Sequence, residues 1–127
     1  MTAVLIIDDE SDFRALAREI LEGAGYDVYE AADGEEGVKT VKDRSIDLVV
    51  TDIYMPRKGG AETILEIRKI RPDVKIIAVS GGGMFSPEAS LKSAKIHGAD
   101  RVLAKPVQFD RLVSLVDEIL GQIDGTG

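Results

Sequence analysis

The chain of 127 residues contains no cysteine and only one histidine. The absence of cysteine excludes disulfides, thiolate zinc sites and cysteine nucleophiles. A single histidine excludes a multi-histidine metal centre, while a Ser-His-Asp triad stays conceivable. Any metal site in this chain must therefore draw on oxygen ligands.

Long apolar runs and an excess of positive charge are also missing. Apolar runs are only a few residues long, so we expect no membrane span. The N-terminus lacks the basic segment of a secretory signal, so we expect a cytoplasmic protein. Lys and Arg number 16 against 23 Asp and Glu, which gives a net charge of -7. This acidic balance disfavours direct nucleic-acid binding, and the charge alone does not identify a binding partner.

The remaining composition is that of a globular protein. Hydrophobic residues make up 44% of the chain and charged residues 31%. A chain of this size buries roughly two-thirds of the surface that its unfolded state exposes. We expect one domain over residues 1–123, followed by a frayed tail at 124–127.

Three short apolar runs predict buried strands, and each run ends in a polar side chain. They are Val4–Asp8, Leu48–Asp52 and Val74–Ser80. Runs without polar alternation suit strands that are covered on both faces, as in a parallel sheet. Weaker strand candidates lie at 27–31 and 101–104.

Helical spacing of apolar residues predicts five helices that alternate with these strands. Asp9 or Ser11 could cap the first helix, and Asp33 with Glu36 forms a candidate capping box for the second. The predicted helical segments are 13–21, 33–41, 61–71, 86–97 and 109–123. Strict alternation predicts an α/β fold, a doubly wound (βα)5 sandwich of the flavodoxin-like kind. Its five-stranded parallel sheet would have the order 2-1-3-4-5.

The polar residues at the carboxyl ends of these strands are the candidate site. In this fold ligands bind at that edge, where the strand order reverses. With the order 2-1-3-4-5, Asp8 and Asp9 would lie beside Asp52, while Ser80 and Lys105 would follow the two remaining strands. Three converging carboxylates repel one another and require a cation. An all-oxygen donor set selects a hard ion, most naturally Mg²⁺.

Taken together, these motifs resemble the receiver domain of two-component response regulators. The resemblance rests on Asp8-Asp9, on Asp52-Ile-Tyr-Met-Pro56 with Gly60, on Ser80 and on Lys105-Pro106. They occur in this order along almost the whole chain. Each motif is weak alone, whereas the set is highly specific.

The resemblance implies a stand-alone phosphoaccepting receiver, similar to chemotaxis regulators. Asp52 would accept a phosphoryl group from a sensor histidine kinase or a histidine phosphotransfer protein, with Ser80 and Lys105 contacting that group. The chain would be no enzyme beyond its own phosphorylation and dephosphorylation. It would act on an unidentified downstream protein, without contacting nucleic acid or membrane, as a monomer or a weak phosphorylation-dependent dimer.

The same resemblance implies a set of magnesium ligands. Asp9, Asp52 and the backbone carbonyl of Tyr54 would bind Mg²⁺ directly. Asp8 would act mainly through a metal-bound water.

A conformational switch is also implied by the resemblance. Ser80 would move toward phosphorylated Asp52 and reshape a protein-binding face elsewhere. Pro106 is a candidate cis peptide, although base rates favour the trans form. Val102 stands where many receivers place Tyr or Phe, so the usual aromatic switch is absent. The glycine-rich segment 81–85 is either a plain connector or a mobile lid.

Two other function classes remain open. A pseudo-receiver would keep the fold as an interaction module without being phosphorylated. A phosphatase of the haloacid dehalogenase type also uses an Asp nucleophile and Mg²⁺. That family requires Asp-x-Asp after its first strand, where this chain has Asp8-Asp9-Glu10, and its usual core and cap need a longer chain.

Overall fold

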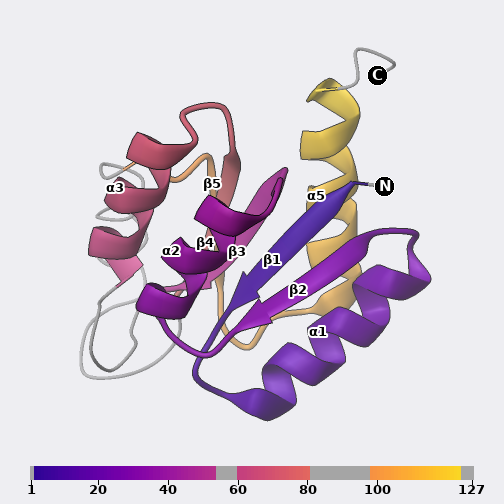
Figure 1. Cartoon of the computed structure of the whole chain (residues 1–127). Coiled ribbons are helices and arrows are strands. Elements are labelled where there is room, and N and C mark those ends of the chain that lie inside the picture. The colour runs from indigo at the N-terminus through magenta and orange to yellow at the C-terminus, as the bar shows by residue number, and fades with distance from the viewer. Residues whose placement is uncertain (1, 54–59, 81–97, 124–127) are drawn as a thin grey trace.

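The computed structural model describes residues 2–53, 60–80 and 98–123, and in these ranges it contains five strands and four helices (Figure 1). Their bounds are β1 (Ala3–Ile7), α1 (Ser11–Gly23), β2 (Asp27–Ala31), α2 (Gly34–Asp43), β3 (Leu48–Asp52), α3 (Gly60–Ile70), β4 (Lys75–Ser80), β5 (Arg101–Ala104) and α5 (Phe109–Ile123).

The five strands form one parallel sheet in the order β2-β1-β3-β4-β5, which confirms the predicted order. The chain begins near the middle of the sheet, with β2 on one side of β1 and β3 on the other. In the β1–β3 register Ile7 lies opposite Thr51. The carboxyl ends of these two strands are therefore neighbours, and the strand order reverses between them.

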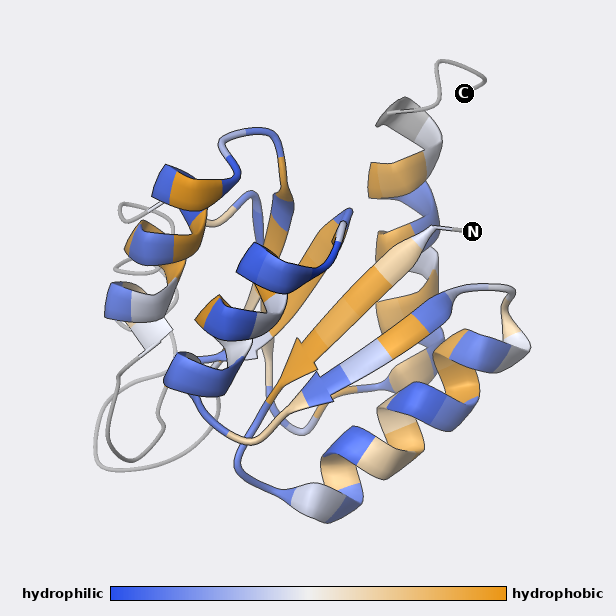
Figure 2. Cartoon of the chain, in the orientation of Figure 1, coloured by the Kyte–Doolittle hydropathy of each residue, from blue (hydrophilic) through white to orange (hydrophobic). Residues whose placement is uncertain are grey.

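Helices cover both faces of the sheet, with α1 and α5 on one face and α2 and α3 on the other (Figure 1). Successive side chains of β1 alternate between the two layers, as strand geometry requires. Leu5 and Ile7 pack toward α2 and α3, whereas Val4 and Ile6 pack toward α1 and α5. Because both faces are covered, the central strands are mostly apolar, with polar residues at their ends, while the helices are apolar on one side only (Figure 2).

Most predicted element bounds agree with the structure, and the first and fourth strands differ by one residue. The predicted strands at 27–31, 48–52 and 101–104 and the helix at 109–123 are confirmed. β4 begins at Lys75 because the N–H of Val74 donates to Arg71 O in the preceding turn. β1 ends at Ile7 because the Asp8 carboxylate accepts the N–H two residues further on, which turns the chain.

The start of α1 corrects a second expectation. Glu10 occupies the N-cap position, and its side chain makes no capping hydrogen bond, so neither Asp9 nor Ser11 caps this helix. The Asp8 carboxylate instead accepts the N–H of Glu10, and this hydrogen bond forms the turn that precedes the helix. At α2 the predicted cap is present, with Asp33 Oδ1 accepting the N–H of Glu36 at 2.9 Å. The Glu36 carboxylate returns to the N–H of Ala32, one residue earlier than a strict capping box.

Several predictions lie outside the described residues. These are the helix at 86–97, the segment 81–85, Tyr54 and the tail at 124–127. Within the described ranges, none of the helices is both long and apolar enough to cross a bilayer.

Gly60, the first residue of α3, lies directly against the end of β3. Its N–H donates to Ile53 O at 2.9 Å. A Cβ at this position would lie 2.4 Å from Ile53 Cα and 2.6 Å from Asp52 O. Both are backbone atoms that cannot move aside like a flexible side chain. The connection after Asp52 therefore requires glycine where it returns to the strand.

Replacing Gly60 by alanine should destabilise the protein by about 2–3 kcal/mol, because the added methyl group overlaps the backbone that carries Asp52. Urea unfolding measures this change. Gly23→Ala is the matched control, since nothing lies within 4 Å of its added Cβ, and it should shift stability by less than about 1 kcal/mol. Equal stability of the two variants would contradict this account of Gly60.

Candidate functional site

Three aspartates meet at the carboxyl edge of the sheet. Asp8 directly follows β1 and Asp52 ends β3, and the two residues are only 1% and 6% exposed. Asp9 is exposed. One carboxylate oxygen from each aspartate lies within 4.8 Å of the other two. The acidic cluster predicted from the strand ends is therefore present.

Asp8 is fixed through both its backbone and its carboxylate. Its N–H donates to Ala31 O at the end of β2 at 3.1 Å. Its Oδ1 accepts the N–H of Glu10 at 2.8 Å, and its Oδ2 lies 3.3 Å from the Lys105 ammonium. Burial raises the pKa of Asp8 and the charge of Asp52 adds to this effect, while the Glu10 N–H and Lys105 oppose it.

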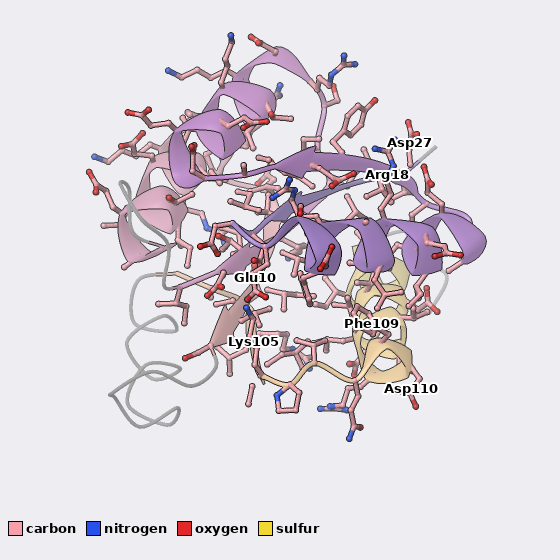
Figure 3. The ribbon with its side chains drawn as sticks, turned by 90° about the horizontal axis from the view of Figure 1, so that it is seen from below. Glu10, Arg18, Asp27, Lys105, Phe109 and Asp110 are labelled. Carbon is pink, nitrogen blue, oxygen red and sulfur yellow. The ribbon has the colours of Figure 1, made fainter. Side chains whose placement is uncertain are left out.

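Lys105 supplies the positive charge that the cluster requires. It follows β5, and its Nζ lies 2.9 Å from Asp52 Oδ2. Glu10 lies close to the same ammonium, with its Oε1 at 3.5 Å (Figure 3). Its own N–H donates to Ser80 O at 2.8 Å, which holds the backbone beside β4. Burial lowers the pKa of Lys105, but the hydrogen bond and charge of Asp52 outweigh that effect and raise it above its usual value. The ammonium therefore stays charged beside the carboxylates.

An aromatic side chain of α1 borders the ammonium. The Lys105 Nζ lies 5.4 Å from the ring centroid of Phe13, within the range of a cation–π interaction. The Phe13 ring in turn packs on Phe109 at the start of α5, with centroids 5.7 Å apart. A cavity of about 290 Å³ lies here, between the start of α1 and the connection from β5 to α5.

Ser80 ends β4, the strand between β3 and β5. It is fully buried, and its hydroxyl has no hydrogen-bond partner in the part of the chain that the structure describes. An unpaired buried hydroxyl is unfavourable and calls for an explanation. Its place between the strand that carries Asp52 and the strand that leads to Lys105 makes it available to a ligand bound at that edge.

The remaining predicted site residues are placed as follows. The Lys105–Pro106 peptide bond is cis, as the candidate assignment proposed and against the base-rate preference for trans. Val102 is half-buried on β5 and packs against the core layer of α2 and α3. Tyr54 falls outside the described ranges, so its carbonyl stays a prediction.

Sequence reasoning missed two side chains that shape the site. Phe13 begins the segment 13–21, whose apolar spacing predicts only a helix, and nothing in the sequence singles out Arg14. The Arg14 guanidinium donates to the backbone carbonyl of Asp8 at 2.7 Å. No spacing signal in the sequence points to this contact, because a long side chain reaches a backbone carbonyl six residues earlier.

The acidic cluster fits a small hard cation. Its donors are all carboxylate oxygens, the type that Mg²⁺ prefers. Ligands on opposite sides of an octahedral Mg²⁺ ion are roughly 4 Å apart, which is close to the 4.8 Å limit of this set. Mg²⁺ usually keeps several waters, and the exposed side of Asp9 leaves room for them.

Comparison with known proteins identifies the family of this arrangement. A family model described as the response regulator receiver domain matches residues 4–117. The chain belongs to this family. Receiver domains of this kind act in two-component signalling, which agrees with the resemblance found in the motifs. The acidic cluster, Ser80 and Lys105 thus lie at the carboxyl edge of a receiver-domain sheet.

Individual relatives match almost the whole of this chain, but the match spans very different shares of their own length. The chain is 38% identical over 117 residues to chemotaxis protein CheY of Thermotoga maritima, covering 91% of this chain and 95% of that protein. It is 32% identical to sensor kinase CckA of Brucella abortus, covering 95% of this chain but 13% of that protein. A solved CheY-like receiver domain from Methanospirillum hungatei shares 30% identity with a TM-score of 0.87, over 100% of this chain and 99% of the other.

The raised pKa of Asp8 predicts how stability depends on pH when divalent cations are removed. The folded receiver domain binds this proton more tightly than the unfolded chain, whose ordinary pKa is 3.8. Ionisation of Asp8 therefore costs stability as the pH rises through this range. Asp8→Asn should raise the free energy of unfolding at pH 7 in EDTA, and this gain should vanish below the ordinary pKa of 3.8.

Urea unfolding at the two pH values measures this effect. The control is Asp73→Asn, an exposed carboxylate before β4 at the opposite end of the sheet, which should give no comparable gain. An Asp8→Asn variant that is less stable than the wild type at neutral pH would contradict the assignment of Asp8 as an electrostatic cost.

Proposed function

We propose that this receiver domain accepts a phosphoryl group on Asp52 from a phosphohistidine, with Mg²⁺ held by Asp9 and Asp52. The donor would be a sensor histidine kinase or a histidine phosphotransfer protein. The observation that supports this most is the Lys105 ammonium, 2.9 Å from the Asp52 carboxylate at the edge of the acidic cluster. A buried nucleophile, a fixed cation and a set of cation ligands are the parts that phosphoryl transfer needs.

In the proposed reaction the carboxylate of Asp52 is the nucleophile. One of its oxygens bonds to phosphorus as the bond from phosphorus to the imidazole nitrogen breaks, and the imidazole leaves with that electron pair. The product is an acyl phosphate on Asp52. Bound Mg²⁺ would supply positive charge to the phosphoryl oxygens, whose charge grows in the transition state. Asp8 would support the ion mainly through water, and the Tyr54 carbonyl would complete the protein ligands.

Lys105 and Ser80 would hold the transferred group. In the resting receiver the ammonium contacts Asp52 Oδ2, so it already lies where phosphoryl oxygens would arrive. A lysine ammonium is a compact point charge that can follow the oxygens with little rearrangement. The unpaired hydroxyl of Ser80 would donate to another phosphoryl oxygen and gain the partner that it lacks within the described residues.

Partners would approach from the open side of the cluster. Receiver domains interact with histidine kinases, and the exposed Asp9 together with the adjoining cavity leaves this side accessible to an imidazole. The phosphorylated domain would then act by binding another protein. It would catalyse only its own phosphorylation and dephosphorylation, and its net charge of -7 disfavours direct contact with nucleic acid.

Incubation with acetyl phosphate and Mg²⁺ should add one phosphoryl group to the wild-type protein. Asp52→Asn should give no adduct, because an amide is not a comparable nucleophile. Asp73→Asn, which removes an exposed carboxylate far from the cluster, should react like the wild type. Intact mass spectrometry measures all three, with EDTA in parallel samples to test the requirement for the metal.

The outcomes separate the alternatives. A pseudo-receiver would form no adduct with acetyl phosphate or with a phosphorylated histidine kinase. A phosphatase of the haloacid dehalogenase type would release inorganic phosphate over many turnovers from phosphate monoesters. An adduct that persists in Asp52→Asn would disprove the assignment of the phosphoacceptor.

Ser80 variants should separate reactivity from stability. Ser80→Ala removes a buried hydroxyl without a partner among the described residues, so it should leave the unphosphorylated protein as stable or about 1 kcal/mol more stable. The same variant should accept phosphoryl groups more slowly, by about tenfold or more, because it loses a hydrogen bond to a charged phosphoryl oxygen. Ser80→Thr keeps the hydroxyl and should retain most of the rate. Wild-type phosphorylation rates in Ser80→Ala would show that the hydroxyl plays no part.

A further inference from the structure

Arg14 contacts the acidic cluster through a backbone carbonyl and not through a carboxylate. It lies on the first turns of α1, where its N–H donates to Glu10 O at 3.1 Å. Its guanidinium NH1 donates to the carbonyl oxygen of Asp8 at 2.7 Å. The carbonyl of Asp8 and the nitrogen of Asp9 belong to one planar peptide unit. A hydrogen bond that fixes this carbonyl therefore fixes the direction in which the chain continues to Asp9.

The Arg14 side chain is itself held by a carboxylate of β2. Its Nε donates to Glu30 Oε1 at 3.2 Å, and the other oxygen of Glu30 accepts from Arg18 NH1 at 3.0 Å. The planar guanidinium can bind the Asp8 carbonyl and Glu30 in two fixed directions at once. Exposure of the side chains increases along this row, from 17% at Arg14 to 27% at Glu30 and 45% at Arg18. The inner pair is thus the better shielded from solvent.

Arg14 and Lys105 act on different atoms of the cluster. Lys105 contacts carboxylate oxygens of Asp8 and Asp52, the atoms that a cation would also require. Arg14 binds the carbonyl of Asp8 and leaves those carboxylate oxygens to other partners. Its positive charge is paired with Glu30, so its net field on the cluster is reduced. Arg14 can therefore orient the acids without competing with the ion for its ligands.

We propose that Arg14, braced by Glu30, is a positioning residue that sets the Asp8–Asp9 peptide for cation binding. This inference rests on the proposed function, because it concerns the ion that Asp9 and Asp52 would hold. Residues that orient metal ligands in this indirect way commonly change metal affinity by about 10- to 100-fold when they are replaced.

The test compares Arg14→Met with Arg18→Met in a titration with Mg²⁺ alone. Binding is followed by the amide chemical shifts of Asp9 and Glu10 in ¹⁵N NMR spectra, which also show that each variant is folded. Removing a positive charge near a cation site would relieve Coulomb repulsion and so tighten Mg²⁺ binding. If Arg14 is a positioning residue, its replacement should instead weaken Mg²⁺ binding, with an affinity about 10-fold lower in Arg14→Met than in the wild type. Arg18→Met, one turn further from the cluster, should bind like the wild type.

A second measurement without any cation separates this inference from the proposed function. Backbone order parameters of Asp9 and Glu10 should fall from about 0.85 toward 0.6 in Arg14→Met and stay unchanged in Arg18→Met. Unchanged or tighter Mg²⁺ binding in Arg14→Met would overturn the positioning role. A wild-type protein that binds no Mg²⁺ would disprove the proposed metal, and the order parameters alone would then decide on Arg14, with unchanged values overturning its role.

Discussion

The mutual repulsion of three carboxylates at one edge of the sheet is the constraint on which the site depends. Two like charges about 4 Å apart repel by about 4 kcal/mol at an effective dielectric constant of about 20. Asp8 and Asp52 are also buried, which adds a desolvation cost to their ionised forms. The fold offsets these costs with the Lys105 ammonium, which lies within 3.3 Å of both carboxylates. A bound cation would offset them further.

The sheet topology brings together side chains from the ends of four of its five strands. The reversal of strand order between β1 and β3 places Asp8 beside Asp52. Lys105 reaches both acids from beyond β5, past the end of β4, where Ser80 lies. The tight return at Gly60 leaves no room for a side chain against the Asp52 carbonyl. The same backbone that builds the sheet thereby sets the Asp52 carboxylate among its partners, and α1 adds Phe13 and Arg14 from one side.

Much of this could be predicted from the sequence, because periodicity and strand ends are local signals. Apolar runs located the strands, and the polar residues at their ends predicted that Asp8, Asp52 and Lys105 lie at one edge of the sheet. The direct contacts of Lys105 with the two carboxylates emerged only from the structure. The Asp8–Arg14 contact depends on the direction of a long side chain, which spacing alone does not determine. The turn at Asp8 is also not predicted from the sequence. Its carboxylate accepts a hydrogen bond from the Glu10 N–H and another from Lys105, and the sequence does not show which partners a carboxylate takes. The close approach at Gly60 follows from the packing of two backbone segments, which the amino-acid composition does not show.

The central claim is that the acidic cluster is a cation site set around Asp52. Its most direct test is the free energy of unfolding measured as a function of Mg²⁺ concentration, for the wild type and for Asp9→Asn. The account predicts a wild-type gain that reaches about 2.7 kcal/mol when Mg²⁺ is 100 times its dissociation constant, and a much smaller gain in the variant. A wild-type free energy of unfolding that does not change with Mg²⁺ concentration, or an equal gain in Asp9→Asn, would contradict this account.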